Sequence, residues 1–164
     1  MERYSSLLAV FALVLSVDIA PAQDHAPCDG RLVSERDESS AVTDAQCFSF
    51  EDLEALPQVS FSTSTIWTNG VQSFQGVPLS EFVRERPGAK TVRLIALNDY
   101  FAPINVEKLD NDYPIIAIFQ NEESLALGRM GPFWVVYPYD LDKDFQRPEV
   151  LHSSVWMLRE IEVR

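Results

Sequence analysis

The run IIAIF at residues 115–119 contains no polar side chain. A strand with one face in water alternates polar and apolar residues, whereas an uninterrupted apolar run is typical of a strand buried on both faces. We therefore expect residues 115–119 to form a buried strand. Neighbouring runs are apolar or alternating, and turns rich in polar residues, Gly or Pro separate them. The pattern predicts strands over 91–97, 114–119, 133–137 and 155–163.

Two short helices are expected before these strands. Ser49 and Asp52 have the spacing of a capping box, and apolar residues follow at helical spacing until Pro57. Pro78 suits the first position of a second helix, which should end at the Pro-Gly pair 87–88.

Between the expected helices, residues 59–67 are rich in β-branched and aromatic side chains and end before the turn signal Asn69-Gly70. This segment predicts a further strand. Strands joined to short helices in this way indicate an α+β domain with a β-rich mixed sheet.

Length and charge limit the possible classes of protein. The chain has 164 residues, 13 Lys and Arg against 25 Asp and Glu, and a formal net charge of −12. One globular domain fits this length. Nucleic acids and anionic membrane surfaces are not expected partners, because both require a basic surface.

The first residues have the form of a secretory signal. Arg3 precedes the apolar stretch 7–17, and Ala20-Pro21-Ala22 resembles a signal peptidase site. A membrane anchor is the alternative, but a spanning helix needs about 20 apolar residues and Asp18 interrupts this stretch. We expect residues 1–22 to be removed, which predicts a periplasmic protein that has no membrane span after cleavage.

Cys28 and Cys47 are expected to form a structural disulfide in this oxidising compartment. The disulfide would tie residues 23–47 to the following domain and add up to about 3 kcal/mol in the chain-entropy model. The sequence between the cysteines is mostly polar, with little capacity to fold by burial alone. Two free buried thiols remain the alternative, while the spacing does not favour a catalytic or metal-binding pair.

Candidate catalysts are few. The chain has two histidines, His25 and His152, and lacks the motifs of zinc proteases, nucleotide-binding loops and serine hydrolases. Aspartates at 140, 142 and 144 alternate as in a calcium loop, but the second half of that motif is missing. We expect a solvated acidic loop there.

Several motifs occur in a characteristic order: FSFEDLEALPQ from residue 48, FQGVPLSEFV at 74–83, ALNDYFAPI at 96–104, GRMGPFWVVYP at 128–138 and the closing VWMLREIEVR. In this order they resemble the molybdopterin-binding domain of the sulfite oxidase family, and most closely its small exported single-domain members. The resemblance covers residues 48–164 and implies a β-rich α+β fold.

The chain also departs from that family. In catalytic members a cysteine thiolate ligates molybdenum from the segment that corresponds to residues 59–75, where this chain has no cysteine. Trp134 and Val155 stand where the family often has Arg and Lys. An anionic cofactor would bind poorly to such a site, so we expect no cofactor, with molybdopterin as the lesser alternative.

We therefore expect a non-redox periplasmic module that uses the family's cleft to bind a small, pterin-like ligand. Two aromatic side chains would stack on the ring, and neighbouring polar groups would bind its edge. A molybdopterin-dependent oxidoreductase and an interaction module for a membrane signalling protein or an enzyme subunit are the alternatives. The candidate ligand-binding residues are Thr65, Trp67, Asn98, Asp99, Tyr100, Arg129 and Gly131.

Overall fold

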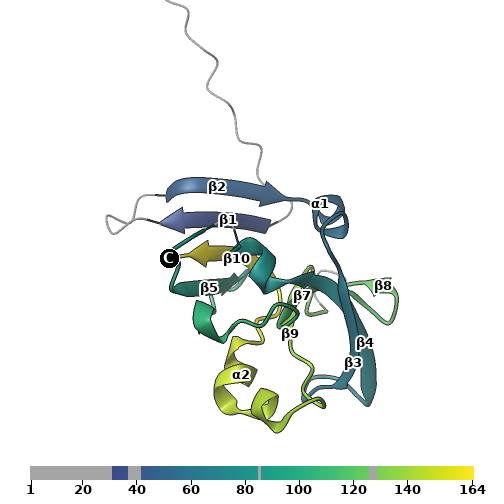
Figure 1. Ribbon diagram of the computed structural model, residues 1–164. Helices are drawn as coiled ribbons and strands as arrows, with labels where there is room; N and C mark the ends of the chain where they lie inside the picture. The colour runs from purple at the N-terminus through teal and green to yellow at the C-terminus, as the bar shows by residue number, and fades with distance from the viewer. Residues whose placement is uncertain (1–30, 37–41, 85, 126–128) are drawn as a thin grey trace, which may run out of the picture.

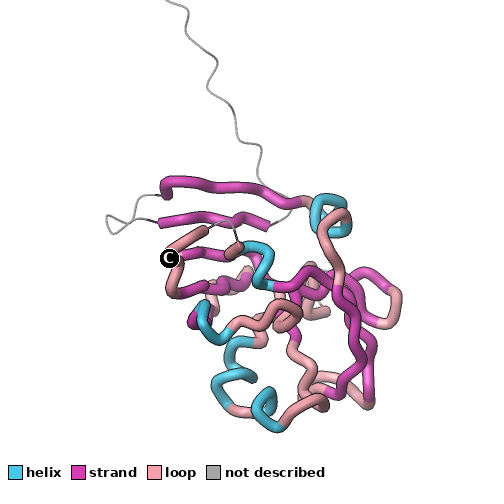
Figure 2. The backbone as a smooth tube through the Cα atoms, viewed as in Figure 1, coloured by secondary structure: helices cyan, strands magenta, loops and turns pink. Residues whose placement is uncertain are grey.

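Two β-sheets and several short helices make up the protein in a computed structural model (Figure 1). The structure describes residues 31–36, 42–84, 86–125 and 129–164, and the side chains from residue 46 onward. The predicted signal peptide and Cys28 lie outside the described residues. Figure 2 shows that the helical segments stand between strands and form no layer of their own. The prediction of a β-rich α+β domain with short helices is confirmed.

Sheet A has five strands in the order β2-β1-β10-β5-β6. Strand β1 pairs in parallel with β10, and the other neighbours are antiparallel, so this sheet is mixed. The expected mixed character is therefore present in one of two sheets. Its strands are β1 (Arg31–Arg36), β2 (Val42–Phe48), β5 (Thr91–Ala96), β6 (Phe101–Asn105) and β10 (Leu158–Val163).

Sheet B is antiparallel throughout, with the order β3-β4-β7-β8 and with β9 on β7. Strand β7 is central, because β4, β8 and β9 all pair with it. The strands are β3 (Val59–Ser64), β4 (Val71–Pro78), β7 (Ile115–Gln120), β8 (Glu123–Ser124) and β9 (Trp134–Val136).

The apolar run in β7 lies in the core, as predicted. Ile115, Ile116, Ala117 and Ile118 are all fully buried. Burial of each isoleucine contributes about 1.5–3 kcal/mol relative to an exposed side chain. Phe119 is half-buried and completes an edge-to-face pair with a phenylalanine of the first helix.

The first helix, α1 (Phe50–Glu54), forms where the capping box predicts it. Ser49 Oγ accepts the Asp52 backbone N–H at 3.1 Å, and Asp52 accepts the Ser49 N–H at 2.9 Å. The bond from the Ser49 backbone also lowers the pKa of the Asp52 carboxyl. Leu53 anchors the helix, since its side chain is fully buried.

The second expected helix is a single 3-10 turn, η1 (Leu79–Phe82), and the prediction of a longer helix was wrong. Pro78 ends strand β4 and precedes the turn instead of occupying its first position. The Leu79 N–H donates to the Pro114 carbonyl at 2.8 Å. This bond keeps the chain beside β7 through the turn.

Several elements were not predicted. Strands β1 and β2 pair although their sequences offer little apolar burial, because β1 also pairs with β10 from Leu32 to Glu35. Cys47 lies in β2, and no described cysteine is free. Its expected partner lies outside the described residues, so the pairing stays a prediction. The other additions are β4, β6, β8, η2 (Val106–Lys108), η3 (Lys143–Gln146) and α2 (Pro148–Ser153).

None of the helices in the described part of the chain is long and apolar enough to cross a bilayer.

Candidate functional site

Three segments meet at one end of sheet A through backbone hydrogen bonds. The Met157 N–H donates to the Met130 carbonyl, and the Leu97 N–H donates to the Met157 carbonyl, both at 2.8 Å. Each segment contains a non-glycine residue with positive φ: Asp99 at 64°, Met130 at 68° and Met157 at 52°. Such conformations are costly for methionine and occur preferentially at binding sites. Their convergence marks this end of the sheet as the candidate site.

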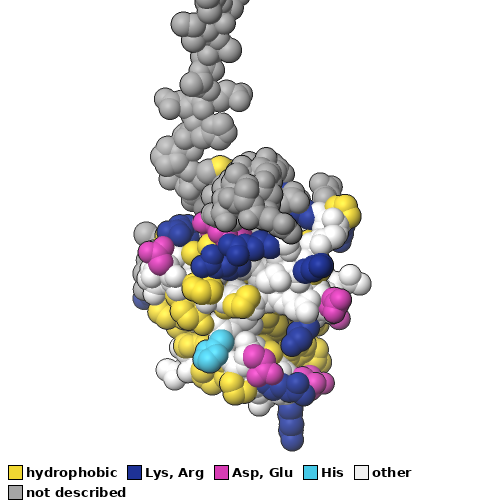
Figure 3. Space-filling view, turned by 90° about the vertical axis from the view of Figure 1, so that its left-hand side faces the viewer, with side chains coloured by type: hydrophobic (Ala, Val, Ile, Leu, Met, Phe, Trp, Pro, Cys, Tyr) yellow, Lys and Arg dark blue, Asp and Glu magenta, His cyan; other side chains and the backbone are white. Residues whose placement is uncertain are grey.

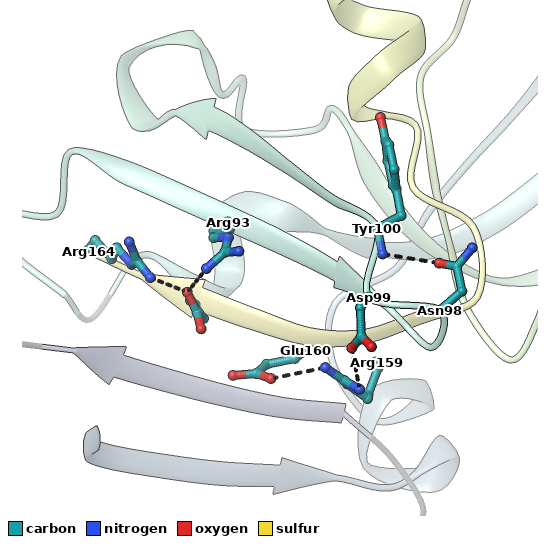
Figure 4. Close-up of polar contacts among 8 residues, drawn as sticks. Arg93, Asn98, Asp99, Tyr100, Arg159, Glu160 and Arg164 are labelled. Carbon is teal, nitrogen blue, oxygen red and sulfur yellow. Dashed lines mark hydrogen bonds and ion pairs between the residues drawn. The ribbon is translucent and has the colours of Figure 1, made fainter. Parts of the chain in front are cut away.

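The turn between β5 and β6 carries the tripeptide Asn98-Asp99-Tyr100. Asn98 Oδ1 accepts the Tyr100 N–H at 3.2 Å, and the Ala96 N–H donates to the Tyr100 carbonyl at 2.9 Å. Asn and Asp tolerate such turns because their short polar side chains bond to nearby backbone groups. With its oxygen engaged, the Asn98 side chain offers its NH₂ group as a donor (Figure 4).

A pocket of about 160 Å³ opens beside this turn. Tyr100 and Trp156 are 45% and 40% exposed, so both rings present a free surface. The Tyr100 hydroxyl donates to the His152 carbonyl at 2.8 Å, which fixes the ring against α2. Figure 3 shows that hydrophobic side chains gather on one face of the molecule, with acidic and basic groups between them. The pocket is lined by Ala96, Asn98, Tyr100 and Trp156.

Asp99 does not line this pocket. Its carboxylate forms an ion pair with Arg159 of β10 at 3.2 Å and points away from Asn98 and Tyr100 (Figure 4). Gly131 is buried and precedes a cis peptide bond to Pro132. Neither residue lines the pocket.

Thr65 and Trp67 lie in the loop between β3 and β4. Thr65 Oγ1 accepts the Trp67 and Thr68 backbone N–H groups at 3.1 and 3.0 Å. The Trp67 ring packs edge-to-face on Trp134, with centroids 5.7 Å apart. Thr65 lines a second pocket of about 310 Å³, together with Tyr139 and other residues.

Arg129 lines a third pocket, of about 300 Å³, beside Gln72, Gln120 and Asn121. The side-chain amides of this pocket bond to one another: Gln72 Oε1 accepts hydrogen bonds from the Gln120 amide at 3.2 Å and from the Asn121 amide at 2.6 Å. Of the seven predicted residues, four line these three pockets, whereas Trp67, Asp99 and Gly131 line none of the three. The structure brings Asn98 and Tyr100 together in one pocket, and places Thr65 and Arg129 in two others.

Trp156 was not among the predicted residues. The sequence indicates a strand over 155–163, in which Trp156 would count as a strand residue. In the structure β10 begins at Leu158, because Met157 has positive φ and breaks the extended conformation. Nothing in the sequence marks this break, because methionine rarely adopts a positive φ, so the pattern alone could not have identified Trp156.

Asp140 holds the end of β3, where the loop to β4 begins. Its carboxylate accepts the Ser64 hydroxyl at 2.6 Å and the Ser64 N–H at 2.5 Å. These two bonds, the side-chain bond first, lower the pKa of the Asp140 carboxyl. Within the described residues, no group of three or more His, Cys, Asp or Glu side chains could hold a metal ion.

Two tyrosine–serine pairs hold α2 against the chain that follows β9. The Tyr137 hydroxyl lies 3.0 Å from Ser153 Oγ, and the Tyr139 hydroxyl donates to Ser154 Oγ at 2.6 Å. Burial raises the pKa of Tyr137 to about 12, and it also raises the pKa of Tyr139. These contacts position the His152 carbonyl that holds Tyr100.

We expect the protein to lose stability in alkali. Tyrosine in an unfolded chain titrates near pH 10, and the pKa of Tyr137 is raised to about 12 in the folded protein. The stabilising contribution is therefore complete below about pH 10 and is lost as the pH rises toward the folded value. Urea unfolding at a series of pH values measures the free energy of unfolding. In Tyr137→Phe this free energy should fall less steeply with rising pH than in the wild type. An unchanged slope in the variant would contradict the assignment.

The lining residues do not fit molybdopterin. The described residues that line the Asn98 pocket include no thiol and no cation. The loop between β3 and β4 has no cysteine, and Arg129 lines a different pocket. The pocket therefore offers no ligand for molybdenum and no positive charge for the cofactor's phosphate.

No protein-family model matches the chain, and no curated protein matches it either. The geometry of the site therefore carries the functional argument.

Proposed function

We propose that this protein is a non-redox binding module that holds a small planar ring between Tyr100 and Trp156. The supporting observation is the pocket in which two partly exposed aromatic rings and the Asn98 amide converge. Aromatic side chains attract flat rings by stacking, and a few polar groups then fix the orientation of the ring.

The size and polarity of the pocket define the ligand. A volume of about 160 Å³ is smaller than the roughly 300–1,000 Å³ of pockets for drug-sized molecules. It suits one fused pair of six-membered rings. Because Asn98 offers a donor and no cation lines the pocket among the described residues, the ring should be neutral and carry an acceptor, such as a carbonyl or a ring nitrogen.

A pterin has this chemistry. The resemblance of residues 48–164 to sulfite oxidase-type molybdopterin-binding domains also supports a pterin-like ring, without requiring a metal. The predicted signal peptide places the binding module in the periplasm in this proposal. Oxidoreduction is the less favoured function, because the lining residues do not fit the molybdenum cofactor.

A calorimetric titration of the protein with pterin tests this function. We expect wild-type protein to bind and Trp156→Ala to weaken binding by about tenfold or more, because stacking contributes about 1–3 kcal/mol per ring. Trp156→Phe keeps an aromatic face and should retain most of the affinity. Leu141→Ala truncates a 67% exposed side chain outside the pocket and is the matched control.

The role of Asn98 is tested in the same titration. Asn98→Asp keeps the acceptor for the Tyr100 N–H but replaces the donor with a carboxylate. It should weaken binding of pterin and leave binding of naphthalene, a ring pair of similar size without acceptors, unchanged. Equal pterin affinity in the wild type and Trp156→Ala would refute the site. Near-stoichiometric molybdenum in protein purified from a molybdenum-replete host would refute the non-redox assignment.

A further inference from the structure

Strand β3 (Val59–Ser64) lies at an edge of sheet B and, among the described strands, pairs only with β4. A sheet edge presents unpaired backbone N–H and C=O groups, which proteins usually protect with proline, charge, bulges or a covering element. Edge strand β6 carries Pro103 and packs against α2, and edge strand β8 has two residues. The six residues of β3 include no proline and no charged side chain.

The register of β3 shows which of its residues point their backbone N–H and C=O groups away from β4. Residues from Val59 to Ser64 pair with β4 without a shift, and the Ser64 N–H donates to Asp140 instead of β4. Alternate residues of an antiparallel strand turn their backbone groups to the same side. Ser60 and Ser62 therefore also turn their N–H and C=O groups away from β4.

The partner strand gives the same result independently. Ser73 lies opposite Ser62, and its backbone accepts the Asn121 N–H at 2.9 Å and donates to Asn121 Oδ1 at 3.0 Å. Ser73 thus faces β7, so Ser62 and Ser73 form a pair without mutual backbone bonds. Ser60 and Ser62 are both exposed, and their small side chains leave the edge accessible.

Acidic residues flank this uncharged edge. Glu54 closes the helix just before β3, and Asp140 is bonded to its last residue. Asp112 precedes Tyr113, whose ring packs edge-to-face on Phe61 of β3 with ring centroids 5.5 Å apart. All three carboxylates are on exposed residues, and the chain as a whole has a net charge of −12. A second copy of the chain would meet like charge at this edge, whereas a basic segment would meet opposite charge.

We propose that β3 is a docking strand, which an extended basic segment of another protein joins by β-strand addition. The added strand would form main-chain hydrogen bonds with Ser60 and Ser62, and its flanking Lys or Arg residues would lie near Glu54 and Asp140. This interaction is independent of the pocket at Asn98, because the two sites lie on different sheets.

Hydrogen exchange of the full mature protein tests the proposal, with the peptide acetyl-Lys-Thr-Val-Thr-Val-Thr-Lys-amide as the probe. At a peptide concentration of about 1 mM, a level suited to weak binding, we expect exchange of the Ser60 and Ser62 amides to slow by about tenfold. Added salt should reduce this protection, because the flanking charges are exposed. The same peptide with Glu in place of Lys should give no protection.

Three variants separate the backbone contribution from the side chain. Ser62→Pro removes the outward N–H and should abolish protection at Ser60 with little change in Tm, since this N–H is not part of the ladder with β4. Ser62→Ala keeps the N–H and should bind as wild type. If Ser62→Pro does not fold, Ser62→Lys provides the test, because it leaves the backbone intact and should repel the basic peptide.

Several outcomes would overturn the proposal. These are absence of protection with the basic peptide, equal protection with the acidic one, and unchanged binding in Ser62→Pro or Ser62→Lys. A concentration-dependent dimer that protects Ser60 and Ser62 without peptide would show that a second copy occupies the edge. Pterin binding is unaffected by each of these results, so the two proposals fail separately.

Discussion

Gly76→Ala is expected to destabilise the protein by about 3 kcal/mol or more. A Cβ atom at this position would overlap the Ile116 carbonyl oxygen and lie 2.6 Å from the Ala117 Cα atom. Both atoms belong to the backbone of β7, so no side-chain rotation can relieve the overlap. Because Gly76 also lies where the pairing of β4 with β7 shifts register, the two central strands would have to separate. Chemical denaturation followed by far-UV circular dichroism measures the effect.

Gly70→Ala is the matched control. Gly70 has a φ of 68°, and a Cβ there would have no heavy atom within 4 Å. The cost should be that of an alanine in the left-handed region, about 1–2 kcal/mol. A Gly76→Ala protein as stable as Gly70→Ala would show that β4 and β7 are further apart than the structure has them.

Trp134→Ala should cost about 4 kcal/mol, as expected for truncation of a large buried aromatic side chain. Trp134 is fully buried and packs edge-to-face on Phe74 at 5.3 Å and on Trp67 at 5.7 Å. Its removal would leave a cavity between β4, β9 and the loop after β3. The shift in the midpoint of urea unfolding measures the loss, provided that the dependence of the unfolding free energy on urea concentration is unchanged.

Two substitutions serve as controls for this effect. The Trp134 indole nitrogen has no hydrogen-bond partner among the described residues, so Trp134→Phe loses volume but no hydrogen bond and should cost clearly less than Trp134→Ala. Trp156→Ala should leave stability within about 1 kcal/mol of wild type, because that ring is partly exposed. Equal losses in Trp134→Ala and Trp156→Ala would contradict the assigned core.

The sequence was most informative where local chemistry and burial agree. The apolar run of β7 and the capping box of α1 each specify one conformation without distant contacts, and both form as predicted. The coarse α+β class follows from such elements. The 3-10 turn after Pro78 differs from the predicted helix because a bond from Leu79 to Pro114 holds it to the sheet, and that bond depends on tertiary structure.

Elements that depend on distant strands could not be predicted. The hairpin of β1 and β2 has no strong periodic pattern, and its ladder to β10 supplies what the local sequence lacks. Helix α2 is similar, since two buried tyrosine hydroxyls from the chain after β9 fix it in place. Propensity does not reveal such partners.

The site was predicted in part. Asn98 and Tyr100 share a pocket, and the hydrogen bond from the Tyr100 N–H to Asn98 Oδ1 is a local contact that the sequence can predict. Thr65 and Arg129 line other pockets because strand pairing within sheet B and the packing of the chain after β9 determine their neighbours, which spacing along the chain does not specify. Trp156 was missed because the positive φ of Met157 is a tertiary effect.

The parallel pairing of β1 with β10 has a kinetic consequence. Leu32 lies beside Glu160, so the ladder joins residues from nearly opposite ends of the sequence. Contacts of such long sequence separation require closure of a very large loop and slow the folding of β-rich domains. A hairpin isolated in water is marginally stable. Strands β1 and β2 should therefore join sheet A late, after β5 and β10 have paired and given them an edge on which to form.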